Sequence, residues 1–140
     1  MAFGTFDGLH QGHLHFFKQA RRLAKNSYLI VSIARDKNVF KIKGKKPIKN
    51  EKQRIILVKK LIKTKLIDKV VLSGLKNHIP HILKQAPDII ALGYDQKAYV
   101  KNLKQNLQTE SKALSKNFSP KIVRLKPYKE KIYKNSLLNR

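Results

Sequence analysis

The chain has 140 residues, of which 41% are hydrophobic, and this suits a single domain with a packed core rather than a disordered chain. It contains no cysteine, which excludes disulfides, thiolate catalysis and cysteine-bound zinc. No apolar run approaches the roughly 20 residues of a membrane-spanning helix, and no signal peptide precedes the glycine-rich start, so we expect one cytoplasmic domain over residues 1–140.

The charge is strongly unbalanced. There are 32 Lys and Arg residues against 8 Asp and Glu residues, which gives a formal net charge of +24. A positive field of this size attracts nucleotides, phosphorylated metabolites and nucleic acid. The lysines are spread along the whole chain rather than gathered in one arm, so we interpret most of them as a solvated basic surface.

The first part of the chain alternates short apolar runs with helical patterns. A short apolar stub stands before Gly4, and apolar residues then recur at helical spacing over about residues 13–25. Residues 28–33 form a β-branched run typical of a strand that is buried on both faces. A basic loop is expected over residues 41–47. Asn50, with Gln53 three residues later, predicts the capped start of a helix whose apolar face reaches Ile62.

The same alternation continues to the C-terminal part. Strands are predicted at residues 69–72, 89–92 and 121–125, with a short helix near Pro80 and a longer polar helix over about residues 96–114. Residues 117–120 read as a turn, and the tail from residue 126 as a loop that leads towards a last helix. His78 and His81 have no carboxylate nearby in the sequence, and we interpret them as surface residues.

Short strands that alternate with helices predict an α/β fold: a five-stranded parallel sheet with helices on both faces. Ligands in such folds bind beyond the carboxyl ends of the strands. Asp7, Asp36 and Asp95 each follow a predicted strand and are expected at that edge, whereas Asp68 and Asp88 precede strands and belong to the opposite edge.

The stretch from Gly4 to His13 holds three glycines and two histidines where a strand passes into a helix. Glycine permits tight turns and the close approach of a ligand, and a helix start offers N–H groups and positive dipole charge to an anion. His10 and His13 are three residues apart, so both can hydrogen-bond phosphate oxygens and, if protonated, stabilise charge on them. The alternative is a pair of structural histidines beside an ordinary turn; we favour the phosphate site.

Further motifs follow this one in a familiar order, and together they resemble the HxGH-class nucleotidyltransferases. Within that class the chain is most similar to the archaeal-type FAD synthases (FMN adenylyltransferases), through its Gly-Tyr-Asp-Gln loop and the run from Arg124 to Tyr128. The matching segments are Gly4–His13, Ala34-Arg35-Asp36, Lys43–Pro47, Glu51 with Arg54, Leu92–Gln96 and Lys134-Asn135-Ser136.

The resemblance implies a Rossmann-like, doubly wound sheet and a set of site residues. His10 and His13, with Lys46, would be catalytic, and Lys43 or Lys46 would reach the phosphates from the loop after the second strand. Arg54 would point to the phosphates or the motif loop. The nucleotide-binding set implied by the resemblance is Thr5, Phe6, His10, Gln11, Gly12, His13, Lys43, Arg54, Asp95, Tyr128 and Ser136, with the backbone of Thr5 and Phe6 near the phosphates and Asp95 at the ribose.

The activity implied is transfer of AMP from ATP to FMN, with Mg²⁺ carried by ATP, no protein metal site, no tightly bound organic cofactor, and a homodimer as one option. Two alternatives stay open at this stage: CMP transfer from CTP to glycerol 3-phosphate or a similar alcohol, and a basic nucleic-acid-binding protein on a degenerate scaffold. Only three residues precede Gly4, where relatives usually have several more, so we also expect a short central strand.

Overall fold

The computed structural model describes residues 1–74, 78–94, 96, 103–114 and 118–127. Five strands form one sheet in the order β3-β2-β1-β4-β5, and all neighbouring strands are parallel. Their bounds are β1 (Ala2–Gly4), β2 (Ile30–Ile33), β3 (Lys69–Leu72), β4 (Ile89–Leu92) and β5 (Lys121–Arg124). The predicted doubly wound, Rossmann-like parallel sheet is therefore confirmed, and its three-residue central strand is short as expected.

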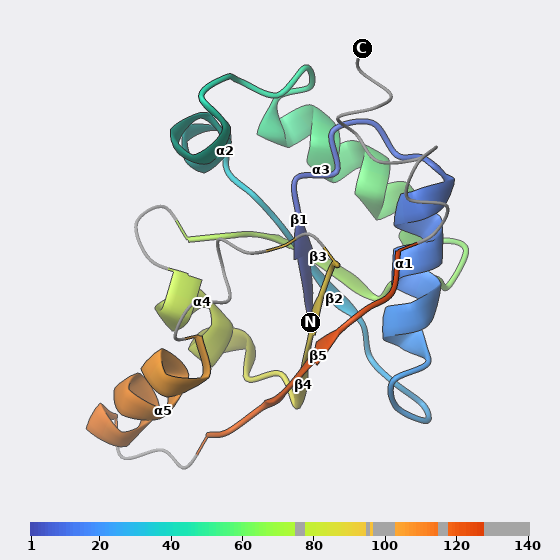
Figure 1. Ribbon diagram of the computed structural model, residues 1–140. Helices are drawn as coiled ribbons and strands as arrows, with labels where there is room; N and C mark the ends of the chain where they lie inside the picture. Colours follow the sequence, from blue (N-terminus) through green and yellow to red (C-terminus); the bar gives the residue numbers. More distant parts are fainter. Residues whose placement is uncertain (75–77, 95, 97–102, 115–117, 128–140) are drawn as a thin grey trace.

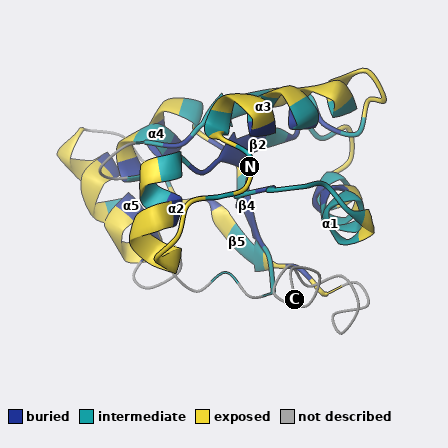
Figure 2. Ribbon diagram, turned by 90° about the horizontal axis from the view of Figure 1, so that it is seen from above, coloured by how far each residue is buried: buried dark blue, intermediate teal, exposed yellow. Residues whose placement is uncertain are grey.

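Helices cover both faces of the sheet. Helices α1 (Gln11–Arg21) and α3 (Glu51–Lys59, continued by the 3-10 turn η1, Lys60–Ile62) lie on one side, and α4 (His78–Gln85) and α5 (Leu103–Ala113) lie on the other (Figure 1). A further helix, α2 (Asp36–Lys43), stands beyond the carboxyl end of β2. Among the strands, the buried residues belong to the three inner ones, β1, β2 and β4, while the outer faces of the helices are exposed (Figure 2).

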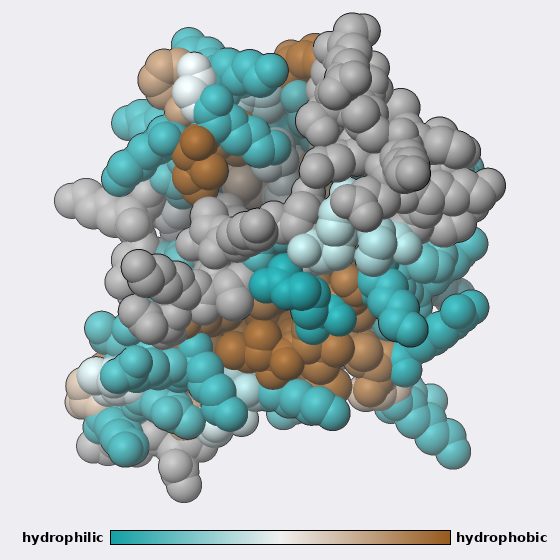
Figure 3. All heavy atoms as spheres, viewed as in Figure 1, coloured by the Kyte–Doolittle hydropathy of each residue, from teal (hydrophilic) through white to brown (hydrophobic). Residues whose placement is uncertain are grey.

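The core is divided by the sheet into two clusters, because alternate residues of a strand face opposite sides. Ala2, Val31 and Ile33 pack with Phe17 of α1 and Val58 of α3. On the other face, the buried cluster contains Phe3, Ile79, Ile82, Ile90, Leu103 and Leu107. Strand β5 is an edge strand, and hydrophobic residues lie between hydrophilic ones on the face that shows β4 and β5 (Figure 3).

The main error of the sequence prediction is α2. Residues 41–47 were expected to form a loop, but Lys41, Ile42 and Lys43 are the last turn of a helix that ends at Gly44. Smaller differences concern element ends: α1 ends at Arg21 rather than near residue 25, and β2 begins at Ile30. The expected start of the helix over residues 96–114 and all of the tail from residue 128 lie outside the described residues, except for Gln96.

The interpretation of His78 and His81 as surface residues is wrong. Both side chains are half-buried at the start of α4, and His81 Nε2 lies 2.8 Å from the hydroxyl of the buried Ser32 on β2. Burial lowers the pKa of both histidines, so they stay neutral at the boundary between α4 and the sheet. In the part of the chain that the structure describes, no helix combines the length and the apolar character that crossing a membrane requires.

Candidate functional site

The loop between β1 and α1 is shaped by two residues with positive φ. Phe6 has φ 54°, an uncommon conformation for an aromatic residue, and Gly8 has φ 87°. The turn folds the Phe6 ring back over β1: a Cβ on Gly4 would stand 2.6 Å from Cζ of that ring. Phe6 as a whole is buried, so its ring belongs to the core under the loop.

The two motif histidines begin helix α1 by capping each other. His10 is the N-cap residue, and its Nδ1 accepts the N–H of Gly12 at 3.0 Å. In return, Nδ1 of His13 accepts the N–H of His10 at 3.3 Å. The imidazole rings stack with centroids 3.9 Å apart, and the edge of Phe6 packs on His13. This is a capping box made with histidines in place of the usual Ser/Thr and Glu/Gln.

The cap fixes the tautomer of both rings. An Nδ1 that accepts a backbone N–H carries no proton, so the proton of each neutral imidazole is on Nε2. The N–H groups of Gly12 and His13 are already bonded to His10, so the sequence expectation of open backbone donors does not hold for these two groups. Nε2 is therefore the nitrogen of each ring that can donate, and His13 has a hydrogen bond with the Gly8 backbone.

His13 is held in its neutral form. Burial is the main cause that lowers the pKa of His13 to about 3, and the charges of His10 and Lys43 lower it further, against a hydrogen bond with the Gly8 backbone. The condition under which His13 would stabilise charge, its protonation, is therefore not met by the protein alone near pH 7. Phosphate oxygens would reverse this electrostatic balance, because a nearby negative charge raises the pKa of an imidazole.

The predicted lysines stand on opposite sides of the end of α2. Lys43 is the last residue of the helix, not part of a loop, and its charge acts on His13. Lys46 lies in the segment after Gly44 and is exposed. The structure therefore brings Lys43 to the histidine pair, while Lys46 lies three residues further on, in the exposed stretch between α2 and α3.

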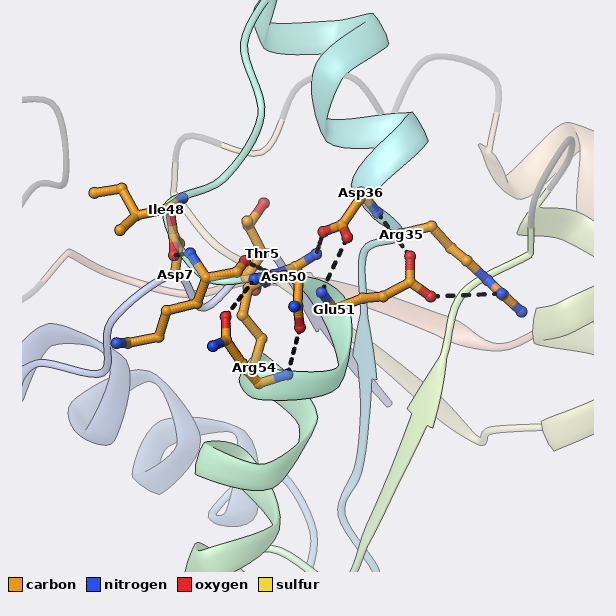
Figure 4. A network of polar contacts seen from close by, with 10 residues as sticks. Thr5, Asp7, Arg35, Asp36, Ile48, Asn50, Glu51 and Arg54 are labelled. Atoms are coloured by element: carbon orange, nitrogen blue, oxygen red, sulfur yellow. Dashed lines mark hydrogen bonds and ion pairs between the residues drawn. The ribbon is translucent and has the colours of Figure 1, made fainter.

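Arg54 is fully buried, so it is not part of the solvated basic surface. Its guanidinium donates to the carbonyl of Thr5 at 2.8 Å, to the carbonyl of Lys49 at 3.0 Å and to the carboxylate of Asp36 at 2.7 Å (Figure 4). The prediction that Arg54 points to the motif loop agrees with this geometry. Because all three acceptors belong to the protein itself, Arg54 holds the motif loop in place through the Thr5 carbonyl.

The carboxylates of Asp36 and Glu51, the first residues of α2 and α3, join the starts of these two helices. Asp36 accepts the N–H of Glu51, and Glu51 accepts the N–H of Asp36, both at 3.1 Å. Glu51 also pairs with Arg35 at 3.7 Å (Figure 4). Arg35 in turn donates to the carbonyl of Ser73, after β3. The expected placing of Asp36 at the ligand edge holds, but its carboxylate is engaged in this network.

The end of β4 is held by two residues that the sequence did not single out. The amide of Gln96 accepts the N–H of Gly93 at 2.8 Å and donates to the carbonyl of Phe3, so it joins β4 to β1. Arg124 donates to the carbonyls of Gly93, Tyr94 and Gln96. Both lie in motifs that carried the family resemblance, but no periodicity or spacing predicts these contacts. Asp95, Tyr128 and Ser136 lie outside the described residues.

The structure therefore gathers much of the predicted set at one edge of the sheet: Thr5, Phe6, His10, Gln11, Gly12, His13, Lys43 and Arg54. Gln11 is the exposed first residue of α1. Among the described residues, no group of three or more His, Asp or Glu side chains could hold a metal ion. The arrangement is a corner that holds two stacked imidazoles, that of His13 neutral, with the charge of Lys43 nearby, and this suits a polyphosphate.

Known proteins resemble the chain over most of its length. A profile of the cytidylyltransferase-like family matches residues 1–133. Two proteins named FAD synthase are 41% identical over 131 residues (Methanothermus fervidus; 93% of this chain and 83% of that protein) and 42% identical over 126 residues (Korarchaeum cryptofilum; 89% and 79%). A third, from Thermococcus sibiricus, is 41% identical over 136 residues, with 95% and 84% covered.

Two solved structures share the fold. One, titled a lipopolysaccharide core biosynthesis protein from Thermoplasma volcanium, has a TM-score of 0.78 and 34% identity, and the match covers 91% of this chain and 95% of that chain. The other, a protein of unknown function from Archaeoglobus fulgidus, has a TM-score of 0.65 at 16% identity, with 89% and 87% covered. The second similarity concerns the fold alone.

Proposed function

The chain belongs to the cytidylyltransferase-like family, and from that premise we propose that it is a nucleotidyltransferase that transfers AMP from ATP to FMN, giving FAD and pyrophosphate. Three relatives of about 41% identity are named FAD synthase, and each match covers most of both chains. The observation that supports the proposal in the structure is the reciprocal cap of His10 and His13, which holds the two imidazoles together at the start of α1, where the charge of Lys43 acts on His13.

The chemistry needs no covalent intermediate. A phosphate oxygen of FMN attacks the α-phosphorus of ATP, the new O–P bond forms, and the bond from the α-phosphorus to the bridging oxygen breaks as pyrophosphate leaves. A phosphate dianion is already a nucleophile, so the protein supplies position and charge stabilisation. This agrees with a site built from donors and cations rather than from a nucleophile and a base.

The proposal gives each residue a role that its position allows. His10 and His13 donate Nε2–H bonds to phosphate oxygens and stabilise the charge that develops as pyrophosphate leaves. Lys43 and Lys46 neutralise the same charge from the segment after α2. Gln11, Gly12 and the backbone of Thr5 and Phe6 complete the wall beside the phosphates. Arg54 acts indirectly, since its contacts are with the Thr5 carbonyl and neighbouring protein groups.

On the nucleotide side, Asp95 binds the ribose hydroxyls, and Tyr128 and Ser136 close the pocket. These assignments are carried by the family resemblance alone. Mg²⁺ would enter with ATP, whose phosphate oxygens are ligands of the kind that this ion prefers. The ion lowers the negative charge of the triphosphate. No tightly bound organic cofactor is part of the proposal.

The two alternatives are less well supported. CMP transfer to glycerol 3-phosphate uses the same corner, but the relatives named FAD synthase favour FMN as acceptor. A pure nucleic-acid-binding role rests on the net charge of +24 and leaves the histidine cap without a purpose. Cytoplasmic location, a homodimer and non-specific binding of nucleic acid stay predictions.

A substrate matrix tests the proposal. The protein is incubated with Mg²⁺, ATP or CTP, and FMN or glycerol 3-phosphate, and pyrophosphate release is measured together with FAD by chromatography. We expect product only with ATP and FMN, and none from the double variant His10→Ala/His13→Ala. His15→Ala, in the same helix, is the matched control and should keep its activity. Release with CTP and glycerol 3-phosphate alone would replace this function by the first alternative.

A further inference from the structure

Asp7 of the motif loop bonds to a segment that is distant in the sequence. One carboxylate oxygen accepts the N–H of Ile48 at 2.7 Å, and the other accepts the N–H of Lys49 at 2.9 Å (Figure 4). The two donors are adjacent, so the carboxylate is bound as a fork. Hydrogen bonds to a charged acceptor are stronger than neutral ones, and two of them fix orientation as well as distance.

This fork closes one end of the segment that carries the lysines. At the other end, α2 stops at Gly44, whose φ of 75° turns the chain away from the helix. Lys45 and Lys46 are exposed between these two points, and Lys43 is exposed just before Gly44. On the far side, Lys49 is bonded twice: its N–H to Asp7 and its carbonyl to Arg54, which also binds the Thr5 carbonyl. The segment is thus attached to the motif loop just before α3 begins.

A carboxylate in a loop that receives a polyphosphate repels that ligand, so its presence there calls for another role. The two obvious chemical purposes do not fit. The phosphate nucleophile of the proposed reaction needs no general base. A metal ligand would need partner ligands, and the described residues contain no group of three or more His, Asp or Glu that includes Asp7. What the geometry does give Asp7 is two backbone donors of one segment.

We propose that Asp7 is a positioning residue: its carboxylate holds the segment of residues 43–49 against the motif loop, so that Lys43 and Lys46 stand beside the His10–His13 pair when a polyphosphate binds. The inference rests on the proposed nucleotidyl transfer for its functional consequence. Its structural content, the attachment of the segment, is independent of the substrate.

The first test is Asp7→Asn. The amide oxygen can still accept one N–H, but the NH₂ group faces the other donor, so the fork is lost. We expect the KM for ATP and the Kd for inorganic pyrophosphate to rise about tenfold, as removal of one charged hydrogen bond would give. The pH profile of kcat should keep its shape, because Asp7 transfers no proton. Trypsin should cut after Lys43 and Lys45 faster than in the parent protein.

Two controls make the result specific. Asp88→Asn removes an exposed carboxylate at the opposite edge of the sheet and should leave KM and the cleavage rate unchanged. In a Lys43→Ala/Lys46→Ala background, Asp7→Asn should change the Kd for pyrophosphate less than about twofold, since the lysines it positions are gone. If Asp7→Asn does not fold, Asp7→Glu, which keeps both acceptors one methylene further out, should show the same changes with smaller size.

The proposal is overturned if cleavage after Lys43 and Lys45 is unchanged, if the effect persists undiminished in the lysine-free background, or if the pH profile shifts as a base would make it do. Failure of the proposed function is a separate outcome. If no substrate pair releases pyrophosphate, the cleavage rates and pyrophosphate affinity still report on Asp7.

Discussion

At the scale of single residues, His13 connects folding with ligand binding. It occupies the third position of α1, where its Nδ1 accepts the N–H of His10, and burial lowers its pKa to about 3. In an unfolded chain the same imidazole has a pKa near 6.5. Between pH 6.5 and 3 the imidazole of His13 is protonated in the unfolded chain but not in the folded protein. The folded protein therefore loses stability as the pH falls from about 6.5 towards 3.

Replacement of His13 by Gln separates these roles. Gln is a usual residue at this position of a capping box and can accept the N–H of His10 through its amide oxygen. We expect His13→Gln to match the parent protein in unfolding free energy at pH 7, and to lose about 1–2 kcal/mol less than the parent between pH 7 and pH 5. Nucleotidyl transfer should fall strongly because the imidazole donor is gone.

Urea unfolding at the two pH values measures this difference. His78 and His81 also have lowered pKa values and contribute a slope of the same sign, so the test is the difference between variant and parent and not the slope itself. Equal slopes in both proteins would show that His13 titrates normally in the folded state.

At the scale of elements, the starts of α2 and α3 depend on one guanidinium. Arg54 is fully buried and binds Asp36 at the start of α2, the Lys49 carbonyl before α3, and the Thr5 carbonyl after β1. An ammonium cannot reproduce three bonds in one plane. We expect Arg54→Met, which leaves Asp36 unpaired, to cost about 3 kcal/mol of unfolding free energy.

Arg54→Lys keeps the charge and should cost less stability, yet it should lower activity clearly, because the Thr5 carbonyl loses its donor. Chemical unfolding and the ATP–FMN assay measure the two effects. Arg22→Lys, at the exposed end of α1, is the matched control and should change neither. Full activity in Arg54→Lys would mean that the position of the motif loop does not depend on the hydrogen bond from the Arg54 guanidinium to the Thr5 carbonyl.

Elements that bury a regular face could be predicted from the sequence, and those held by polar contacts could not. The five strands were found because their apolar runs are continuous, and α3 was found through the Asn50–Gln53 cap. Helix α2 gave no such signal: only Val39 of its eight residues is buried, and its N-cap, Arg35, makes no side-chain cap. It is held instead by Asp36 and by Asn38, which donates to the Gly74 carbonyl.

The same limit applies to the site. The histidine corner follows from local spacing, since both partners lie within four residues. The bonds from Asp7 to Ile48 and Lys49 span about forty residues, and no local pattern encodes them. The burial of Arg54 could not be predicted either, because hydropathy assigns every arginine to the surface. Polar contacts across the fold must therefore be seen in three dimensions.

At the scale of the whole molecule, a small domain carries a net charge of +24, and several of its 8 acidic side chains are engaged in internal contacts. Asp36 and Glu51 serve the network at the carboxyl edge, and Asp68 binds Arg21 and the Leu29 N–H at the opposite edge. Those contacts relieve repulsion locally, but they leave most lysines without a counter-charge of the same chain. The folded state should therefore be under considerable self-repulsion.

Two kinds of anion effect should consequently be separable. Raising the ionic strength with sodium chloride to about 1 M, where the Debye length is about 3 Å, should raise the Tm gradually by screening that repulsion. Inorganic pyrophosphate should act differently, because it binds the corner of His10 and His13 as a ligand. Its stabilisation should follow RT ln(1 + [L]/Kd), about 2.7 kcal/mol at a hundred times Kd, and should appear at concentrations too low to screen charge.

In His10→Ala/His13→Ala the chloride effect should persist while the pyrophosphate effect is lost. Equal responses to pyrophosphate in parent and variant would mean that the anion is held by the general field of the lysines, and that the corner is not a built phosphate site.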